Sequence, residues 1–561
     1  MTTLATGTES LTRDALTVLQ PGFTGTSAPD WLLRQLAEGL TSVGLFGRNI
    51  ESPEQLAALT AQLREVRPEV LVAIDEEGGD VTRLEARTGS SFPGNLALGH
   101  VDDTGLTRAV AGELGRRLAA CGVNLNWAPS ADVNSNPDNP VIGVRSFGDD
   151  PRLVARHTVA YVEGLQAAGV AACVKHFPGH GDTAVDSHHA LPRIDADMDT
   201  LRERELVPFQ AAIDAGTKGV MSAHILLPAL DEALPGTLSP AALMGLLRAS
   251  REDGGLGHTG LIVTDGMEMQ AISGTYGLER GSVLAVAAGA DALCVGGGLS
   301  DEETVLRLRD ALVKAVRDGE LTEQRLADAA ARVRALARWT RNARTAAEAP
   351  APPAAHRASG SAPDVGLEAA RRALTVTVPQ ADPGKETSGG ETPGHGSSGG
   401  GARRARQPLT EPPFVASFTP AANIAVGGET PWGVAAELAR LLPGTAAGTY
   451  GPDGGEGESS TGSTGTTGGT AATGGESALV ASVLADAADR RIVAVVRDVH
   501  RHPWMADALE ALLAARPETV VVEMGVPQAP PSGALHIATH GAARVCGRAA
   551  AEVIAGEAAG G

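Results

Sequence analysis

The chain has 561 residues, of which 43% are hydrophobic, so it is long enough for two domains with cores of their own. Its 46 basic and 67 acidic residues give a formal net charge of −21, which disfavours binding to a nucleic-acid backbone or an anionic membrane. The four cysteines are far apart in sequence and predict small core residues, not a disulfide framework or a zinc site.

Short apolar runs alternate with amphipathic segments between Ser42 and about Gly298. The predicted strands are Val43–Phe46, Val70–Ile74, Leu125–Ala128, Ala171–Val174, Gly219–Ser222, Leu261–Thr264 and Ala292–Val295. The predicted helices are Pro53–Val66, Leu106–Ala120, Pro151–Ala168, Met198–Ala215, Asp301–Arg317 and Thr322–Thr340. This alternation predicts a parallel α/β sheet, and its length suits a (β/α)8 TIM-like barrel over residues 1–345, with a doubly wound open sheet as the alternative.

Residues 346–364 include an Ala- and Pro-rich stretch that predicts a linker to a second domain. Residues 365–561 predict a smaller α/β layered domain, with strands Asn423–Val426, Ile492–Val496 and Val520–Met524 and helices Pro431–Leu442, Ser477–Ala488 and Met505–Ala515. Two inserts, residues 381–406 and 451–476, are rich in Gly, Ser, Thr and charge. We expect both to be disordered, because they cannot bury enough apolar surface to fold.

The stretch from Val174 to Pro192 concentrates titratable side chains in an irregular segment that follows a predicted strand. One interpretation is a metal site, with ligands drawn from His176, His180, Asp182, Asp186, His188 and His189. A second is acid–base chemistry, because Asp186 can accept the imidazole N–H of His188 and stabilise the imidazolium. A third is a histidine-rich loop that bonds only its own backbone.

The string K-H-F-P-G-H-G-D-T-x-x-D-S-H, from Lys175 to His188, resembles the signature of bacterial family 3 β-N-acetylglucosaminidases of the two-domain type. In that family the Asp-x-His pair is the acid/base dyad. The resemblance therefore implies this role for Asp186 and His188, and it implies that Lys175 and His176 bind sugar hydroxyls.

Three further strings resemble segments of the same family. The run Asp75-Glu76-Glu77-Gly78-Gly79 follows a predicted strand, and the resemblance implies sugar binding by Asp75 and Arg83, where the residues alone predict an ion pair in a loop. Arg145, in R-S-F-G, matches a sugar-contacting arginine. Asp265, in I-V-T-D-G-M, matches the nucleophile, whereas a lone T-D-G would predict a turn.

Two more polar residues follow predicted strands. Asp132 is expected to be a structural or substrate-shaping carboxylate. His224 either faces the site or is satisfied by the backbone, and the sequence does not separate these interpretations.

Taken with the resemblance, these residues predict a retaining exo-glycosidase that removes terminal β-linked N-acetylglucosamine from peptidoglycan fragments or chitooligosaccharides. No cofactor or metal is required, the partner is a small carbohydrate, and neither nucleic acid nor membrane binding is expected of the monomer. The alternatives are a phosphorylase with the same site, a metal-dependent hydrolase, and a non-catalytic sugar-binding protein. Without a leader pattern or an apolar run of spanning length, we expect a cytoplasmic protein.

Overall fold

The structure is a computed structural model that describes residues 2–184, 191–298, 301–348, 364–379, 408–420, 426, 430–452 and 476–557. The chain forms two compact units. The first consists of residues 1–90, 94–365 and 423–430, and the second of residues 91–93, 366–422 and 431–561. Whether they correspond to the predicted barrel, linker and carboxyl-terminal domain stays a prediction.

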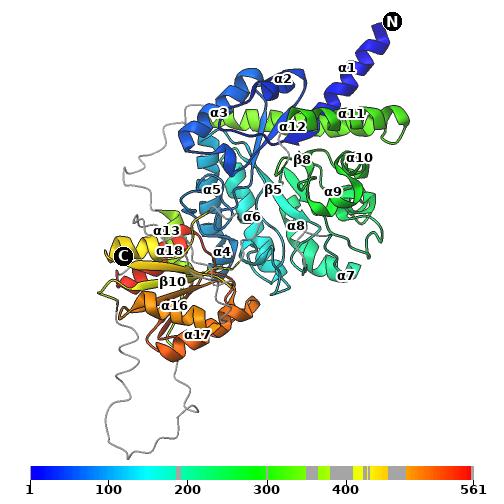
Figure 1. Cartoon of the computed structure of the whole chain (residues 1–561). Coiled ribbons are helices and arrows are strands. Elements are labelled where there is room, and N and C mark those ends of the chain that lie inside the picture. Colours follow the sequence, from blue (N-terminus) through cyan, green and yellow to red (C-terminus); the bar gives the residue numbers. More distant parts are fainter. Residues whose placement is uncertain are drawn as a thin grey trace, which may run out of the picture. The chain divides into compact units, whose positions relative to one another are not determined.

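The first unit is built on a curled parallel sheet (Figure 1). Six strands are paired in chain order: β2 (Ser42–Leu45), β3 (Leu71–Ile74), β4 (Leu125–Asn126), β5 (Ala171–Phe177), β6 (Gly219–Ser222) and β7 (Leu261–Thr264). The strand β8 (Leu293–Val295) is linked to β7 by a bridge between Val263 and Ala292 and pairs in parallel with β1 (Leu19–Pro21). In the described part of the chain no ladder joins β1 to β2. The parallel α/β sheet is thus confirmed, and a fully closed barrel stays a prediction.

Amphipathic helices follow the strands of the first unit, and some of them start at a strong side-chain cap. Ser52 caps α3 (Pro53–Val66), and the Asp150 carboxylate accepts from two backbone N–H groups of α6 (Pro151–Ala167). The other helices are α1 (Thr2–Thr17), α2 (Asp30–Glu38), α4 (Asn95–Val101), α5 (Thr104–Ala120), α7 (Met198–Thr200), α8 (Leu206–Asp214), α9 (Gln270–Tyr276), α10 (Leu278–Ala288), α11 (Glu302–Asp318) and α12 (Glu323–Glu348), with a π-helical turn, η3 (Leu201–Glu205), between α7 and α8.

The core of the first unit shows which end of the parallel strands is covered by a helix. The first residues of several strands, such as Leu71, Leu125 and Leu261, pack in one cluster with Val333 and Leu336 of α12. Helix α12 therefore covers the amino-terminal ends of the strands. The polar residues that follow the strands lie at the opposite, carboxyl-terminal ends, where sites of α/β sheets are usually built.

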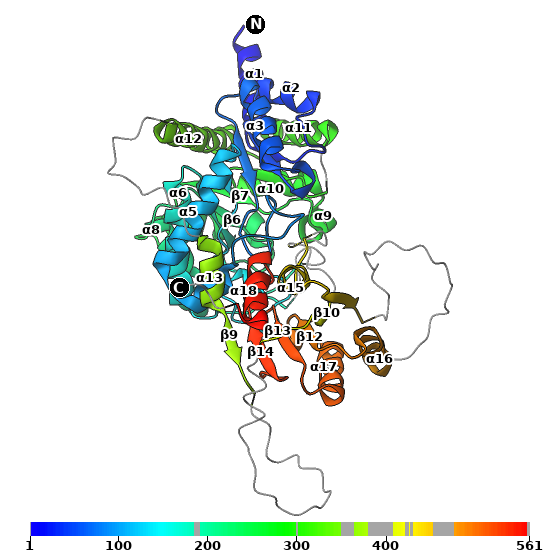
Figure 2. The ribbon, with the colours of Figure 1, turned by 90° about the vertical axis from the view of Figure 1, so that its left-hand side faces the viewer.

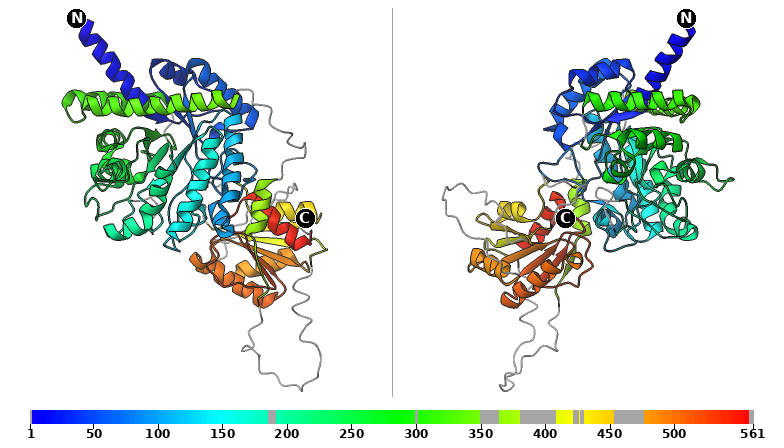
Figure 3. Two further views of the ribbon diagram at one scale, coloured as in Figure 1. Left: turned by 180° about the vertical axis from the view of Figure 1, so that it is seen from behind. Right: turned by 45° about the vertical axis from the view of Figure 1, so that its right-hand side comes forward.

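The second unit contains a six-stranded sheet in the order β11-β10-β12-β13-β14-β9 (Figure 2). Its strands are β9 (Thr375–Thr377), β10 (Phe414–Phe418), β11 (Ala446–Tyr450), β12 (Ile492–Val496), β13 (Val520–Glu523) and β14 (Leu535–Ala538), and only β9 pairs antiparallel. One face carries α13 (Val365–Ala373), α15 (Ala435–Leu441) and α18 (Arg544–Ala555), and the other carries α16 (Glu476–Ala487) and α17 (Pro503–Ala515) (Figure 3). Side chains along β12 alternate between the two faces of the sheet, so this strand contributes to both cores. Val493 and Val495 pack on one face, and Ile492 and Ala494 pack on the other.

Several predicted features of the second half fall outside the described residues. These are most of the predicted linker (residues 349–363), residues 381–406, most of residues 451–476, and all of the predicted strand Asn423–Val426 except its last residue. The strands β10, β11 and β14 and the helix α18 were not predicted from the sequence. No helix in the described ranges combines the length and the apolarity needed to cross a bilayer.

Candidate active site

A cavity of 480 Å³ opens among the carboxyl-terminal ends of the strands of the first unit. It is lined by six of the eight residues predicted to be catalytic or sugar-binding: Asp75, Arg83, Arg145, Lys175, His176 and Asp265. His180, a candidate metal ligand, lines it too. The predicted dyad, Asp186 and His188, lies outside the described residues. The structure therefore brings the first six together, and the chemical roles of all eight stay predictions.

Lys175, on β5, is the centre of a buried ion-pair network. Its Nζ lies 2.5 Å from Oδ1 of Asp75 and 2.7 Å from Oε1 of Glu77. Arg145 approaches Glu77 with two guanidinium nitrogens, Nε at 3.0 Å from Oε2 and Nη2 at 2.7 Å from Oε1. Burial alone would raise the pKa of Glu77, but Arg145 and Lys175 outweigh it and hold that pKa below its usual range. Burial would likewise lower the pKa of Lys175, and the two carboxylates raise it instead.

The three consecutive carboxylates after β3 have three different environments. Asp75 and Glu77 face Lys175, whereas Glu76 turns away and accepts the backbone N–H groups of Arg83 at 2.7 Å and Leu84 at 2.9 Å. Burial raises the pKa of Glu76 to about 7. Glu76 thus shapes the loop that brings the Arg83 side chain to the cavity, and Glu77 is a site residue that the sequence did not single out.

Asp132 is fully buried and organises two histidines, His176 near the end of β5 and His180 in the loop that follows. Its carboxylate accepts the backbone N–H of His176 at 3.1 Å and of His180 at 2.7 Å, and the Ser130 hydroxyl donates to it at 2.9 Å. Nδ1 of His176 lies 2.7 Å from its Oδ2. Because burial is outweighed by these partners, the pKa of Asp132 is lowered, and the carboxylate fixes the proton of His176 on Nδ1. Nε2 of His176 then accepts from Arg145 at 3.4 Å.

Asp265 follows β7 and is half-buried at the cavity wall. Its Oδ1 accepts the backbone N–H of Gly266 at 2.8 Å. His224 does not line the cavity. Its Nε2 donates to the Gly266 carbonyl at 3.0 Å, and its Nδ1 accepts from the Thr237 hydroxyl at 2.9 Å. His224 therefore supports the turn after the candidate nucleophile.

Glu268 and Arg48 form a second support that the sequence did not indicate. The Glu268 carboxylate, which also lines the cavity, accepts the backbone N–H groups of Gly296 and Gly297 after β8. Arg48 donates to the carbonyls of the same two glycines. Glu268 thus binds the backbone N–H groups of this glycine turn, and Arg48 binds its backbone carbonyls. Only the position of Glu268, three residues after Asp265, could have drawn attention to it.

Half of the six candidate metal ligands, Asp186, His188 and His189, lie outside the described residues. Within the described ranges, no three His, Cys, Asp or Glu side chains are grouped as metal ligands. Nδ1 of His180 lies 2.8 Å from the Thr183 hydroxyl, and Asp182 pairs with Arg204 at 2.7 Å. Burial lowers the pKa of His180 to about 4, so this ring is neutral near pH 7.

Residues 29–336 match the Glycosyl hydrolase family 3 N terminal domain. The chain belongs to glycosyl hydrolase family 3.

Relatives and solved structures agree with this assignment. The chain is 35% identical over 317 residues to a beta-hexosaminidase A of Pseudoalteromonas piscicida, which covers 52% of each protein, so it matches only about half the length of that relative. It is 37% identical over 270 residues to a beta-hexosaminidase of Methylococcus capsulatus, covering 47% of this chain and 77% of that protein. A solved family 3 beta-N-acetylglucosaminidase from Paenibacillus sp. str. FPU-7 is 32% identical, with a TM-score of 0.78 over 98% of this chain and 97% of that one.

Proposed function

We propose that the chain is a retaining exo-β-N-acetylglucosaminidase. The observation that carries this proposal is that Asp265 lines the same cavity as the Asp75, Lys175 and Arg145 network. A retaining glycosidase needs a nucleophilic carboxylate beside groups that hold the sugar ring in place. The relatives named beta-hexosaminidase support an N-acetylhexosamine as the sugar.

The network has unused hydrogen-bonding capacity that suits sugar hydroxyls. An ammonium group has three N–H donors, and Asp75 and Glu77 occupy two of those on Lys175. The third can donate to a hydroxyl, while Asp75 can accept from the same or the adjacent one. Further hydrogen bonds to the sugar ring would come from Arg83, Arg145 and His176.

Asp265 would attack the anomeric carbon and form a glycosyl-enzyme. His188, paired with Asp186, would protonate the departing oxygen and then activate water. This assignment rests on the sequence signature. Because a histidine is neutral after it has donated its proton, incoming phosphate would meet less repulsion than from a glutamate, so phosphorolysis is tested alongside hydrolysis.

The proposal is tested by proton NMR of the first sugar released from 4-nitrophenyl N-acetyl-β-glucosaminide, with and without phosphate. The expected product is N-acetylglucosamine in the β configuration. An α product would contradict a retaining mechanism with Asp265 as nucleophile, and a sugar phosphate would show a phosphorylase. Comparing rates on muramic-acid-containing peptidoglycan fragments and on chitooligosaccharides decides which is the natural substrate.

A further inference from the structure

Asn126, the last residue of β4, holds the turn after β3 with its buried side chain. Its Oδ1 accepts the backbone N–H of Glu76 at 3.0 Å, and its Nδ2 donates to the Glu76 carbonyl at 2.8 Å. These two backbone groups belong to the peptide units that join Glu76 to Asp75 and to Glu77. A side-chain amide carries an acceptor and a donor, so it matches both groups at once.

The side chain of Asn126 extends the connection between β3 and β4 beyond the paired strands. Asn126 is the register partner of Ile74, and the N–H of Trp127 donates to the Ile74 carbonyl at 2.8 Å. β3 ends at Ile74. The two bonds of the Asn126 amide then reach Glu76, two residues further along the chain, and anchor the turn to the neighbouring strand.

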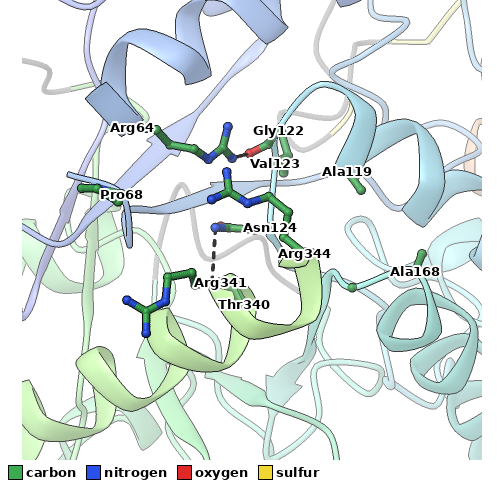
Figure 4. A pocket seen from close by; sticks show the side chains of 11 residues that line it. Arg64, Pro68, Ala119, Gly122, Val123, Asn124, Ala168, Thr340, Arg341 and Arg344 are labelled. Atoms are coloured by element: carbon green, nitrogen blue, oxygen red, sulfur yellow. Dashed lines mark hydrogen bonds between the residues drawn. The ribbon is translucent and has the colours of Figure 1, made fainter. Parts of the chain in front are cut away.

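The same arrangement occurs at the amino-terminal ends of these strands. Oδ1 of Asn124 accepts the N–H of Val72 at 2.7 Å, and its Nδ2 donates to the Val70 carbonyl at 2.9 Å. The amide also donates to the Thr340 hydroxyl of α12 at 3.3 Å (Figure 4). Asn124 thus holds the chain around β3 through the same two kinds of bond, at the end of the sheet away from the candidate active site.

The two asparagines differ in what they hold. Asn124 anchors apolar residues of the core. Asn126 anchors Glu76, which lies between the two carboxylates that face Lys175. The Lys175 Nζ is 2.5 Å from Oδ1 of Asp75 and 2.7 Å from Oε1 of Glu77. A rotation of either peptide unit at Glu76 would move these carboxylates relative to Nζ.

We propose that Asn126 is a positioning residue for the sugar-binding network of Asp75, Glu77 and Lys175. This inference rests on the proposed glycosidase function. Asn126 is not among the described residues that line the cavity, so it acts on the substrate only through the residues that it holds. A misplacement of about 1 Å in groups that orient a substrate can cost about 100-fold in rate.

The experiment compares Asn126→Ala with Asn124→Ala by steady-state hydrolysis of an aryl N-acetyl-β-glucosaminide, at a temperature where circular dichroism shows both variants folded. Each substitution removes two hydrogen bonds to the chain around β3, so both should lower the melting temperature by at least about 2 °C. Asn126→Ala should lower kcat/KM about 10- to 100-fold, whereas Asn124→Ala should keep kcat/KM within about twofold of wild type. If Asn126→Ala does not fold, Asn126→Asp and Asn124→Asp, which keep the size of the side chain, replace the two alanine variants.

A double-mutant cycle separates positioning from a general loss of stability. If Asn126 acts through Lys175, combining Asn126→Ala with Lys175→Met should give about the same kcat/KM as Lys175→Met alone, because the network is already broken. If the double variant does not fold, the comparison of the two single variants decides.

Three results would overturn the proposal: an unchanged kcat/KM in Asn126→Ala, an equal fall in Asn124→Ala, or losses that multiply in the double variant. Each of them leaves the proposed function standing. The proposed function itself fails if the wild-type chain does not hydrolyse the substrate, so the two failures are distinguishable.

Discussion

Replacing Lys175 by Met tests whether the buried network grips the substrate or only stabilises the fold. The Lys175 side chain is 3% exposed and contacts two carboxylates. Breaking a buried ion pair costs about 3–5 kcal/mol when the partner is left buried and uncompensated. Here Glu77 keeps both contacts with Arg145, and the Asp75 side chain is 24% exposed. We therefore expect the free energy of unfolding to fall by about 2–3 kcal/mol, which is less than the cost of leaving a buried charge without any partner.

The same substitution removes a charged hydrogen bond to a sugar hydroxyl, worth about 1.5–3 kcal/mol. At 1.36 kcal/mol per tenfold change, kcat/KM should fall by roughly 10- to 150-fold. The assay is steady-state hydrolysis of an aryl N-acetyl-β-glucosaminide, at a temperature where circular dichroism shows the variant folded. Lys314→Met, at an exposed pair with Asp318, is the control and should leave kcat/KM and the melting temperature unchanged. If the variant is destabilised but its kcat/KM stays within twofold of wild type, Lys175 does not bind the substrate and its role is purely structural.

Three further substitutions test the rest of the site, and a fourth, at the buried Glu205 of η3, tests how stability depends on pH. Asp265→Ala should reduce turnover by at least about 10³-fold without unfolding the chain, and retained activity would sink the nucleophile assignment. His188→Ala should slow substrates with poor leaving groups far more than nitrophenyl glycosides, and added azide should restore the rate; equal losses on both substrate types would count against the dyad. Asp132→Asn should lower kcat/KM about 10- to 100-fold by releasing His176, and an unchanged kcat/KM would contradict this. Burial raises the pKa of Glu205 to about 7 from an ordinary 4.5, so its contribution to stability is complete below about pH 4.5 and is lost as the pH rises through 7; urea unfolding from pH 5 to 8 should show this decline, and a Glu205→Gln variant with the same slope as wild type would disprove it.

Burial on both faces made some strands of the fold predictable from sequence, but not all of them, because the buried strands β1, β10 and β14 were missed. For β6, β7 and β12 the predicted and observed spans agree at both ends, because continuous apolar runs bounded by turn residues define such strands. β1 could not be found in this way. It has three residues, Leu19–Pro21, with a Gln and a Pro among them, and it is a strand because β8 pairs with it. Its partner is distant in sequence, so no local pattern indicates the pairing.

Some residues of the site could be found from sequence motifs, whereas others are recognised only from their contacts in the fold. The motifs identified Asp75, Lys175 and Asp265, and all three line one cavity because the carboxyl ends of the parallel strands meet there. They did not reveal Glu77, since three successive acidic residues after a strand look equivalent in sequence. Only the fold shows that Glu77 faces Arg145 and Lys175 while Glu76 faces the backbone.

The pairing in this network has a consequence for substrate selection. Asp75 and Glu77 are balanced by Lys175 and Arg145, so these four charges cancel before any substrate enters. A neutral sugar therefore meets fixed, already paired groups, and its hydroxyls add hydrogen bonds without having to neutralise a buried charge. An anionic sugar in the same place would find no uncompensated cation among these four groups and would lie beside the Asp265 carboxylate. We therefore expect these four groups to favour a neutral sugar ring, such as an N-acetylhexosamine, over a uronic acid at the proposed position beside Asp265.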